Sequence, residues 1–163
     1  MSETYDYIII GAGSAGCVMA NRLSADPSVS VLLIESGPDH TSPLIAMPRG
    51  IGKLLMAGNP HVWDYQASRG EGMATELWLK GKAIGGSSSV NGMVYVRGAP
   101  ADYDGWEAQG CYGWGWADIG RQFVALEDHQ LGASQWRGAG GPLKVTVHPS
   151  GDPLCEAIIN AAG

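Results

Sequence analysis

The chain begins with a short apolar run that leads directly into a glycine-rich turn. Residues 5–10 (YDYIII) are rich in β-branched side chains, which is typical of a strand buried on both faces of a parallel sheet. Residues 11–16 (GAGSAG) follow at once, and residues 17–24 predict a compact helix that ends before Pro27. Residues 29–35 (VSVLLIE) predict a second buried strand. This order of elements predicts a βαβ unit with parallel strands.

Three glycines in the turn, Gly11, Gly13 and Gly16, have the G-x-G-x-x-G spacing of dinucleotide-binding loops. A pyrophosphate is anionic, and a helix N-terminus offers it backbone N–H donors that glycines make accessible. The spacing alone is weak, because a chain with 25 glycines in 163 residues also forms chance glycine-rich turns. Its place between a strand and a helix, with Glu35 ending the second strand 19 residues after Gly16, favours a dinucleotide site. The predicted contacts are Gly11, Gly13, Ser14, Ala15, Gly16 and Glu35.

The carboxylate of Glu35 also bears on the identity of the dinucleotide. It suits the two hydroxyls of a ribose and would repel a 2′-phosphate. Residues 36–40 supply no Arg or Lys to hold such a phosphate, so NADP is disfavoured. The βαβ unit by itself leaves both NAD and FAD open.

Charge and cysteine content narrow the class of protein. Ten Lys and Arg against 16 Asp and Glu, with no basic cluster, disfavour nucleic acid as a partner. The three cysteines are an odd number at unrelated spacings, so neither a disulfide framework nor a zinc site is expected. No secretory signal precedes the first strand, and no run of 18 apolar residues predicts a membrane span. We expect a reducing, cytoplasmic location, with a membrane-peripheral one left open.

The remaining elements are less regular. Residues 36–80 show no clear period because prolines and glycines interrupt them, although their aromatic content argues for order. The other predicted elements are a short buried helix over 87–96, an amphipathic helix over 117–128, a strand over 142–147, and a helix over 152–162 with Asp152 as N-cap and Gly163 at the C-cap.

Residues 81–98 (GKAIGGSSSVNGMVYVRG) combine a glycine pair, three serines and a single amide among apolar residues. Gly85 and Gly86 allow close backbone approach, and the serines place hydroxyls at a predicted helix start. A buried Asn91 must find hydrogen-bond partners. From the residues alone, a capped core helix whose Asn91 ties down a loop is favoured over a ligand site.

The same segment, followed by Asp102-Tyr103-Asp104 and Trp106, resembles the first signature of the glucose-methanol-choline (GMC) oxidoreductases, FAD-dependent enzymes that oxidise alcohols. With YDYIIIGAGSAG and IESG, the resemblance covers nearly the whole chain. Residues 47–50 (MPRG) and Trp63 are most similar to the choline dehydrogenase and alkanol dehydrogenase branch. The expected fold is α/β: a Rossmann-like, FAD-binding βαβ unit (5–36), a long irregular FAD-covering segment (37–98) and the start of the remaining domain (99–163), together an incomplete GMC fold.

The resemblance implies that residues 87–94 hold the pyrophosphate and flavin of FAD. Some relatives carry, at the position of Val90, a His that bonds covalently to the flavin, so noncovalent FAD is expected here. The implied cofactor contacts are Gly81, Gly86, Ser87, Asn91, Gly92, Met93 and Val94.

The implied reaction is oxidation of a primary alcohol to an aldehyde by hydride transfer to flavin N5, with oxygen or another electron acceptor completing the cycle. In the family a His near the C-terminus of a much longer chain is the base. His40, His61, His129 and His148 do not match that position, so no catalytic base is expected in this chain. A complementary C-terminal polypeptide is the expected partner. An NAD-dependent dehydrogenase and a non-catalytic FAD-binding fragment remain alternatives.

Three other groups of residues have structural interpretations. Asp102, Asp104 and Glu107 are expected at a helix start, not around a metal. Cys17 is expected to pack beside the sheet, although a helix N-terminus could also activate its thiol. The tryptophans at 106, 114 and 116 are expected to pack in a core or between domains, not to form a sugar-binding platform.

Overall fold

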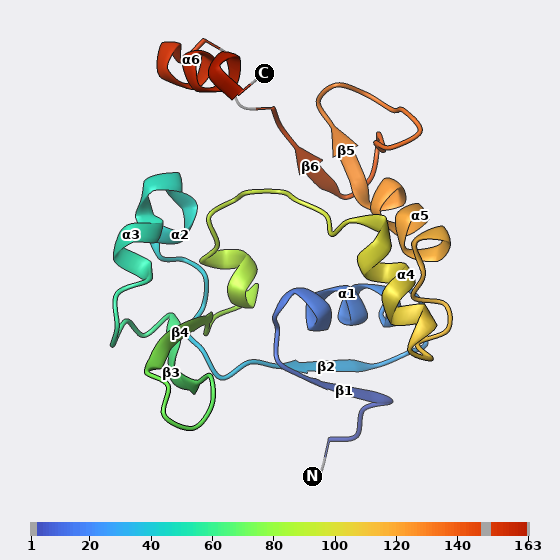
Figure 1. Ribbon diagram of the computed structural model, residues 1–163. Helices are drawn as coiled ribbons and strands as arrows, with labels where there is room; N and C mark the ends of the chain where they lie inside the picture. The colour runs from blue at the N-terminus through green and yellow to red at the C-terminus, as the bar shows by residue number, and fades with distance from the viewer. Residues whose placement is uncertain (1–2, 148–150, 163) are drawn as a thin grey trace. The chain divides into compact units, whose positions relative to one another are not determined.

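The computed structural model describes residues 3–147 and 151–162. The chain divides into two compact units, Met1–Val94 and Tyr95–Gly163, which are described one at a time below (Figure 1). His148 and the predicted cap at Gly163 lie outside the described residues. Within the described ranges, every helix is too short or too polar to cross a bilayer.

The first unit opens with the predicted βαβ arrangement. Strands β1 (Tyr7–Ile10) and β2 (Val31–Ile34) pair in parallel, and helix α1 (Ser14–Leu23) connects them. The carboxylate of Asp6 accepts hydrogen bonds from the backbone N–H (2.8 Å) and hydroxyl (2.7 Å) of Ser30. These bonds join the residues that precede the two strands and so support their register.

The prediction that both strands are buried on both faces is wrong. Ile8 is 59% exposed and Ile10 87% exposed. Helix α1 packs against both strands, but in the described part of the chain the sheet has no third strand and nothing covers the rest of its apolar surface. Parallel sheets normally have both faces covered, so apolar strand residues are left in contact with solvent here.

Residues 36–80, which have no clear sequence period, contain regular structure. Helix α2 (Pro43–Ala46), the 3₁₀ turn η1 (Pro48–Gly50) and helix α3 (Ile51–Leu54) precede an antiparallel hairpin of β3 (Val62–Ser68) and β4 (Thr75–Gly81) (Figure 1). Leu54, Val62 and Val90 form the buried core of this region, and Leu44, Ile45, Leu55 and Leu79 pack against them.

The predicted helix over residues 87–96 is wrong. The structure has a single 3₁₀ turn, η2 (Gly86–Ser89), and the chain is irregular from there to Ala99. Asn91 is exposed, and its side chain accepts a hydrogen bond from the backbone N–H of Met93, which starts a turn in place of a helix. Val94 is 79% exposed, so the apolar residues of this segment do not form a buried helix face.

The helices predicted over 117–128 and 152–162 and the strand predicted over 142–147 are present in the second unit. This unit contains α4 (Pro100–Ala108), α5 (Trp116–Leu126), the parallel pair β5 (Glu127–His129) and β6 (Leu143–Val145), and α6 (Pro153–Ala162). The Asp152 carboxylate accepts hydrogen bonds from the N–H groups of Leu154 and Cys155, which confirms it as the N-cap of α6.

Two of the acidic residues of the second unit have the helix-start roles expected of them, whereas the expected burial of the tryptophans is not seen for Trp106 (47% exposed) or Trp114 (55% exposed). Asp102 accepts a hydrogen bond from the N–H of Ala99 at the start of α4, and Asp104 accepts one from the N–H of Trp116. Buried Tyr103 is the centre of an aromatic cluster, with ring centroids 5.2 Å from Trp106 and 5.6 Å from Trp116. These aromatic side chains therefore join α4 to α5.

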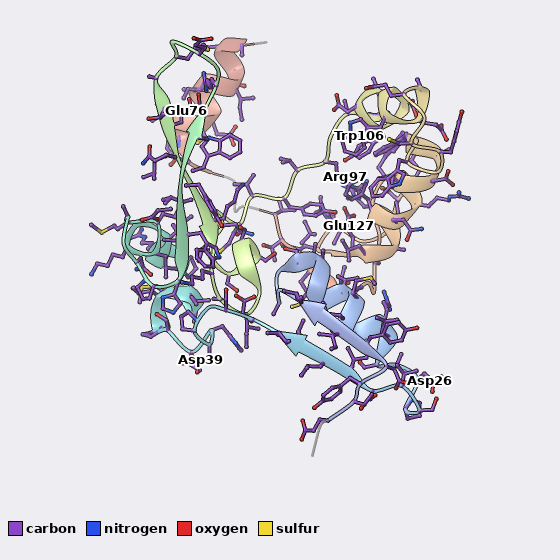
Figure 2. All side chains as sticks on the ribbon, turned by 90° about the horizontal axis from the view of Figure 1, so that it is seen from below. Asp26, Asp39, Glu76, Arg97, Trp106 and Glu127 are labelled. Atoms are coloured by element: carbon purple, nitrogen blue, oxygen red, sulfur yellow. The ribbon has the colours of Figure 1, made fainter. Side chains whose placement is uncertain are left out.

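A buried ion pair between Arg97 and Glu127 lies at the C-terminal end of α5. Glu127 is 1% exposed, and its carboxylate accepts hydrogen bonds from the Arg97 guanidinium and the backbone N–H of Gly138 (Figure 2). Burial raises the pKa of Glu127, but the Gly138 N–H and Arg97 outweigh burial and bring the pKa below its ordinary value. Arg97 also lies over the ring of Phe123, 5.1 Å from its centroid.

Candidate functional site

The predicted glycine loop lies at the N-terminus of α1 and leaves that helix end open. Gly13 is the N-cap residue, and no side chain caps the helix. Ser14 and Ala15 are exposed, and their backbone N–H groups have no acceptor within the helix. Gly16 permits the close contact between helix and loop, because a Cβ at this position would lie 1.9 Å from the carbonyl oxygen of Gly11. The loop therefore offers an anion the positive end of a helix dipole and free donors.

A second segment, far along the chain, lies directly against this loop. The N–H of Gly85 donates to the carbonyl oxygen of Ala12 at 2.7 Å. Gly86 packs so closely that a Cβ on it would lie 2.8 Å from the Cα of Gly13. The hydroxyls of Ser14 and Ser88 are hydrogen-bonded to each other. Residues 11–14 and 85–88 thus form one surface, named here the glycine junction.

Glu35 ties the glycine loop to the turn after β2. One carboxylate oxygen accepts a hydrogen bond from the N–H of Ala12 at 2.8 Å, and the other accepts one from the N–H of Gly37 at 2.9 Å. The Gly37 N–H is the main reason that the pKa of Glu35 lies below its ordinary value, and the Ala12 N–H adds to the effect. The oxygen that faces Gly37 also accepts a long hydrogen bond from the Ser36 hydroxyl at 3.5 Å, so the oxygen bonded to Ala12 is the one that keeps a lone pair for a further hydroxyl group.

We expect Glu35→Gln to lower the melting temperature most at neutral pH. A lowered folded-state pKa means that the carboxylate stabilises the fold fully above its ordinary value of 4.5, and that this contribution is lost as the pH falls through the folded-state pKa. The difference in melting temperature between wild type and Glu35→Gln should therefore shrink below pH 4.5. Thermal unfolding across this pH range measures the difference. Glu71→Gln, at an exposed position, is the control and should change little at any pH.

The three serines of η2 have different partners, which sequence reasoning did not separate. The Ser87 hydroxyl accepts a hydrogen bond from the N–H of Gly81 at 3.0 Å and joins β4 to the turn. The Ser89 hydroxyl donates to the carbonyl oxygen of Ile84. Ser88, which lies in the predicted segment but is not among its individually predicted contacts, is the one that reaches α1. A run of three serines carries no sequence signal for this choice, because the direction of each hydroxyl depends on the 3₁₀ turn.

The predicted residues 91–94 lie beyond η2. In the described part of the chain they make no hydrogen bond to residues 11–16. Asn91 and Met93 line a cavity of about 210 Å³ together with Met47, Pro48 and other residues of α2, η1 and α3. Gly92 and Val94 are exposed. The structure therefore brings Gly81, Gly86 and Ser87 to the glycine junction and places Asn91 and Met93 in the wall of a neighbouring cavity.

The histidines in the described part of the chain have local surroundings of their own. His61 is half-buried, and its ring lies 3.2 Å from the side-chain oxygen of Asn59. His129 accepts a hydrogen bond from the N–H of Leu131 in the second unit. His40 is exposed. Among the residues that the structure describes, no group of three His, Cys, Asp or Glu side chains is placed to hold a metal.

The chemistry of the glycine junction fits the pyrophosphate of a dinucleotide. An uncapped helix end and the hydroxyls of Ser14 and Ser88 supply donors on one exposed surface. The nearest carboxylate, Glu35, has both oxygens bonded to backbone N–H groups, which moderates its repulsion of an anion. The glycines leave the backbone accessible, and Gly13 itself has space for a Cβ.

Comparison with known proteins identifies the family. The sequence model of the GMC oxidoreductase N-terminal region matches residues 5–163. The chain belongs to the GMC oxidoreductase family. Members of this family bind FAD. The family and the partial GMC fold expected from the sequence are thereby confirmed.

Relatives in this family include an alcohol dehydrogenase [acceptor] of Pseudomonas putida, 46% identical over 96% of this chain and 29% of the relative. Human mitochondrial choline dehydrogenase is 41% identical over 98% of this chain and 28% of its own length. The crystal structure of pyridoxine 4-oxidase from Mesorbium loti matches with a TM-score of 0.83 and 40% identity, over 97% of this chain and 31% of that protein. The chain thus spans less than a third of each of these GMC oxidoreductases.

Proposed function

We propose that this chain supplies the FAD-binding portion of an enzyme that oxidises a primary alcohol to an aldehyde. The observation that carries the proposal is the glycine junction, where two segments 74 residues apart in sequence meet at an open helix end. Bound FAD supplies the acceptor for the hydride, at flavin N5. The naming of the Pseudomonas putida relative as an alcohol dehydrogenase supports the choice of substrate class.

The pyrophosphate would be held by the glycine junction. The N–H groups of Ser14 and Ala15 point out of the first turn of α1, and Gly11, Gly13 and Gly16 let the backbone come close. Gly81, Gly86 and Ser87 keep the second segment in place beside them. Glu35 would accept a ribose hydroxyl with the lone pair left free on the oxygen that faces Ala12.

The flavin side of FAD would lie along residues 91–94, and its attachment would be noncovalent. The exposed backbone of Gly92 and Val94 is available to a ligand. Val90 has no nucleophilic atom, and its side chain packs with Leu54 and Val62 in the core. These residues of the chain bind and orient the flavin; the proton of the alcohol is taken by a base outside this chain.

A complementary C-terminal polypeptide would supply that base and cover the exposed strands. The relatives are more than three times as long as the region they share with this chain. Ile8 and Ile10 of β1 and Leu33 and Ile34 of β2 present apolar surface of the kind that a larger parallel sheet buries. A small alcohol and an electron acceptor, oxygen or another oxidant, complete the proposed set of partners.

Production of the 163-residue chain with and without the C-terminal polypeptide tests the proposal. The chain alone should be poorly soluble or inactive. The completed enzyme should be yellow, and its flavin absorption should bleach when a primary alcohol is added without oxygen. Acid precipitation should release the flavin into the supernatant.

Each competing interpretation has its own outcome. A yellow chain that oxidises alcohols on its own would contradict the need for a partner. Recovery of bound NAD in place of flavin would support an NAD-dependent dehydrogenase. A completed, flavin-loaded assembly that no alcohol reduces would support a non-catalytic FAD-binding fragment. Flavin retained in the acid pellet would show a covalent bond.

A further inference from the structure

A cavity of about 460 Å³ lies along one face of helix α5 in the second unit. The helix contributes residues at positions i, i+3, i+4, i+7 and i+8, which share one side of a helix: Ala117, Gly120, Arg121, Val124 and Ala125. The alanines and the glycine have side chains no larger than a methyl group, so the helix leaves room beside it. The volume lies within the range of about 300–1,000 Å³ that is typical of small-molecule sites.

Trp136 adds an aromatic wall to this cavity from the loop between β5 and β6. The hydroxyl of Ser134 accepts a hydrogen bond from the backbone N–H of Trp136 at 3.1 Å. Gly138 joins the same loop to the end of α5, because its N–H donates to Glu127 at 3.0 Å and a Cβ on it would clash with the carbonyl oxygen of Val124. The backbone that carries Trp136 is therefore anchored beside α5, while the side chain is 56% exposed. An anchored and accessible indole ring can stack on a flat ligand.

Each arginine in the wall of the cavity is already paired with a carboxylate. Arg97, whose side chain is 16% exposed, contacts Glu127, and Arg121 contacts Asp118. An anionic ligand would share each guanidinium with that carboxylate, and the repulsion between the two negative charges would offset much of its attraction to the arginine. A neutral acceptor avoids this repulsion. It can still accept a hydrogen bond from the Gln135 amide, or from Arg97, since a guanidinium has more N–H donors than one carboxylate uses.

We propose that the cavity beside α5 binds a flat, neutral aromatic molecule that carries a carbonyl oxygen, such as an aromatic amide. The ring would stack on Trp136 and lie against the small residues of α5, and the carbonyl oxygen would accept a hydrogen bond from Arg97 or Gln135. Every residue that lines the cavity belongs to the second unit, so the inference does not depend on the FAD site of the first unit.

Calorimetric titration of the completed enzyme with 2-naphthamide tests this inference. The amide should bind with a dissociation constant below about 1 mM, and 2-naphthoate, which has the same shape and a negative charge, should bind at least about tenfold more weakly. Ala125→Trp should fill the cavity and weaken the binding of 2-naphthamide at least about tenfold. Trp136→Ala, which removes the exposed ring without disturbing a buried core, should weaken it about fivefold. Ala108→Trp is the matched control, because Ala108 is an exposed residue of α4 outside the cavity wall, and it should leave the affinity unchanged.

Three results would overturn the inference. The first is no heat of binding with 2-naphthamide at about 1 mM, which is also the result expected if the C-terminal polypeptide covers the cavity. The second is 2-naphthoate binding as tightly as the amide. The third is wild-type affinity for the amide in both Ala125→Trp and Trp136→Ala, which would place the probe elsewhere in the enzyme. The flavin absorption of each variant reports on the FAD site separately, so a wild-type enzyme that takes no FAD would instead contradict the proposed function.

Discussion

Gly86→Ala should lose at least about a hundredfold in FAD affinity. The new Cβ would meet the Cα of Gly13 at 2.8 Å; the backbone fixes the position of the Cβ and contains the Cα, so no side-chain rotation relieves the contact. Gly86 also has a φ of 55°, where alanine is strained. Relief of the clash would move residues 85–88 away from α1 and weaken the bond between Gly85 and Ala12. Fluorescence titration of the completed apoenzyme with FAD measures the loss.

Gly58→Ala is the matched control for strain without contact. Gly58 has a φ of 79° in the same unit, and nothing lies within 4 Å of a Cβ built on it. Alanine there should cost about 1–2 kcal/mol of stability and leave the FAD affinity unchanged. If both variants bind FAD equally well, the glycine junction is not part of the cofactor site.

Arg97→Gln should lower the free energy of unfolding of the second unit by about 3–5 kcal/mol. The substitution leaves the Glu127 carboxylate buried with the Gly138 N–H but without its cation. It also removes the charge that lies over the ring of Phe123. Hydrogen exchange of α5 peptides in the completed enzyme, or its urea unfolding, measures the change.

Arg121→Gln is the control for the loss of an arginine from an ion pair. Arg121 contacts Asp118 on the surface of α5, and its side chain is 73% exposed, so its loss should cost less than about 1 kcal/mol.

Adding Glu127→Gln to Arg97→Gln should recover part of the stability, because the neutral amide can still accept a hydrogen bond from the Gly138 N–H without a buried charge. Equal losses in the two single Arg variants would show that burial does not strengthen the Arg97–Glu127 pair.

Some of the candidate site was predictable from the sequence because its signals are local. The glycine spacing, the apolar runs on each side of it and Glu35 all act within one βαβ unit. The turn chemistry at residues 85–93 was harder to recognise. An apolar run after three serines is typical of a buried helix, but positive φ values and the turn at Asn91 produced exposed irregular chain. Residues 63–68 (WDYQAS) of β3 alternate between apolar and polar residues, but the apolar run Leu77-Trp78-Leu79 of β4 does not, and the hairpin was missed.

The sequence by itself determined the βαβ unit, the helices near the C-terminus with the Asp152 cap, and the family, since short-range sterics, capping and periodicity act between residues close in the chain. Only the tertiary structure decided that Ser88 is the serine that meets Ser14, that Glu35 bonds to Ala12 and Gly37, and that Arg97 is buried against Glu127. Such contacts depend on the angles at which turns set distant segments against each other. The conformation of a turn sets the direction of the segment that follows it, so residue type alone does not specify these partners.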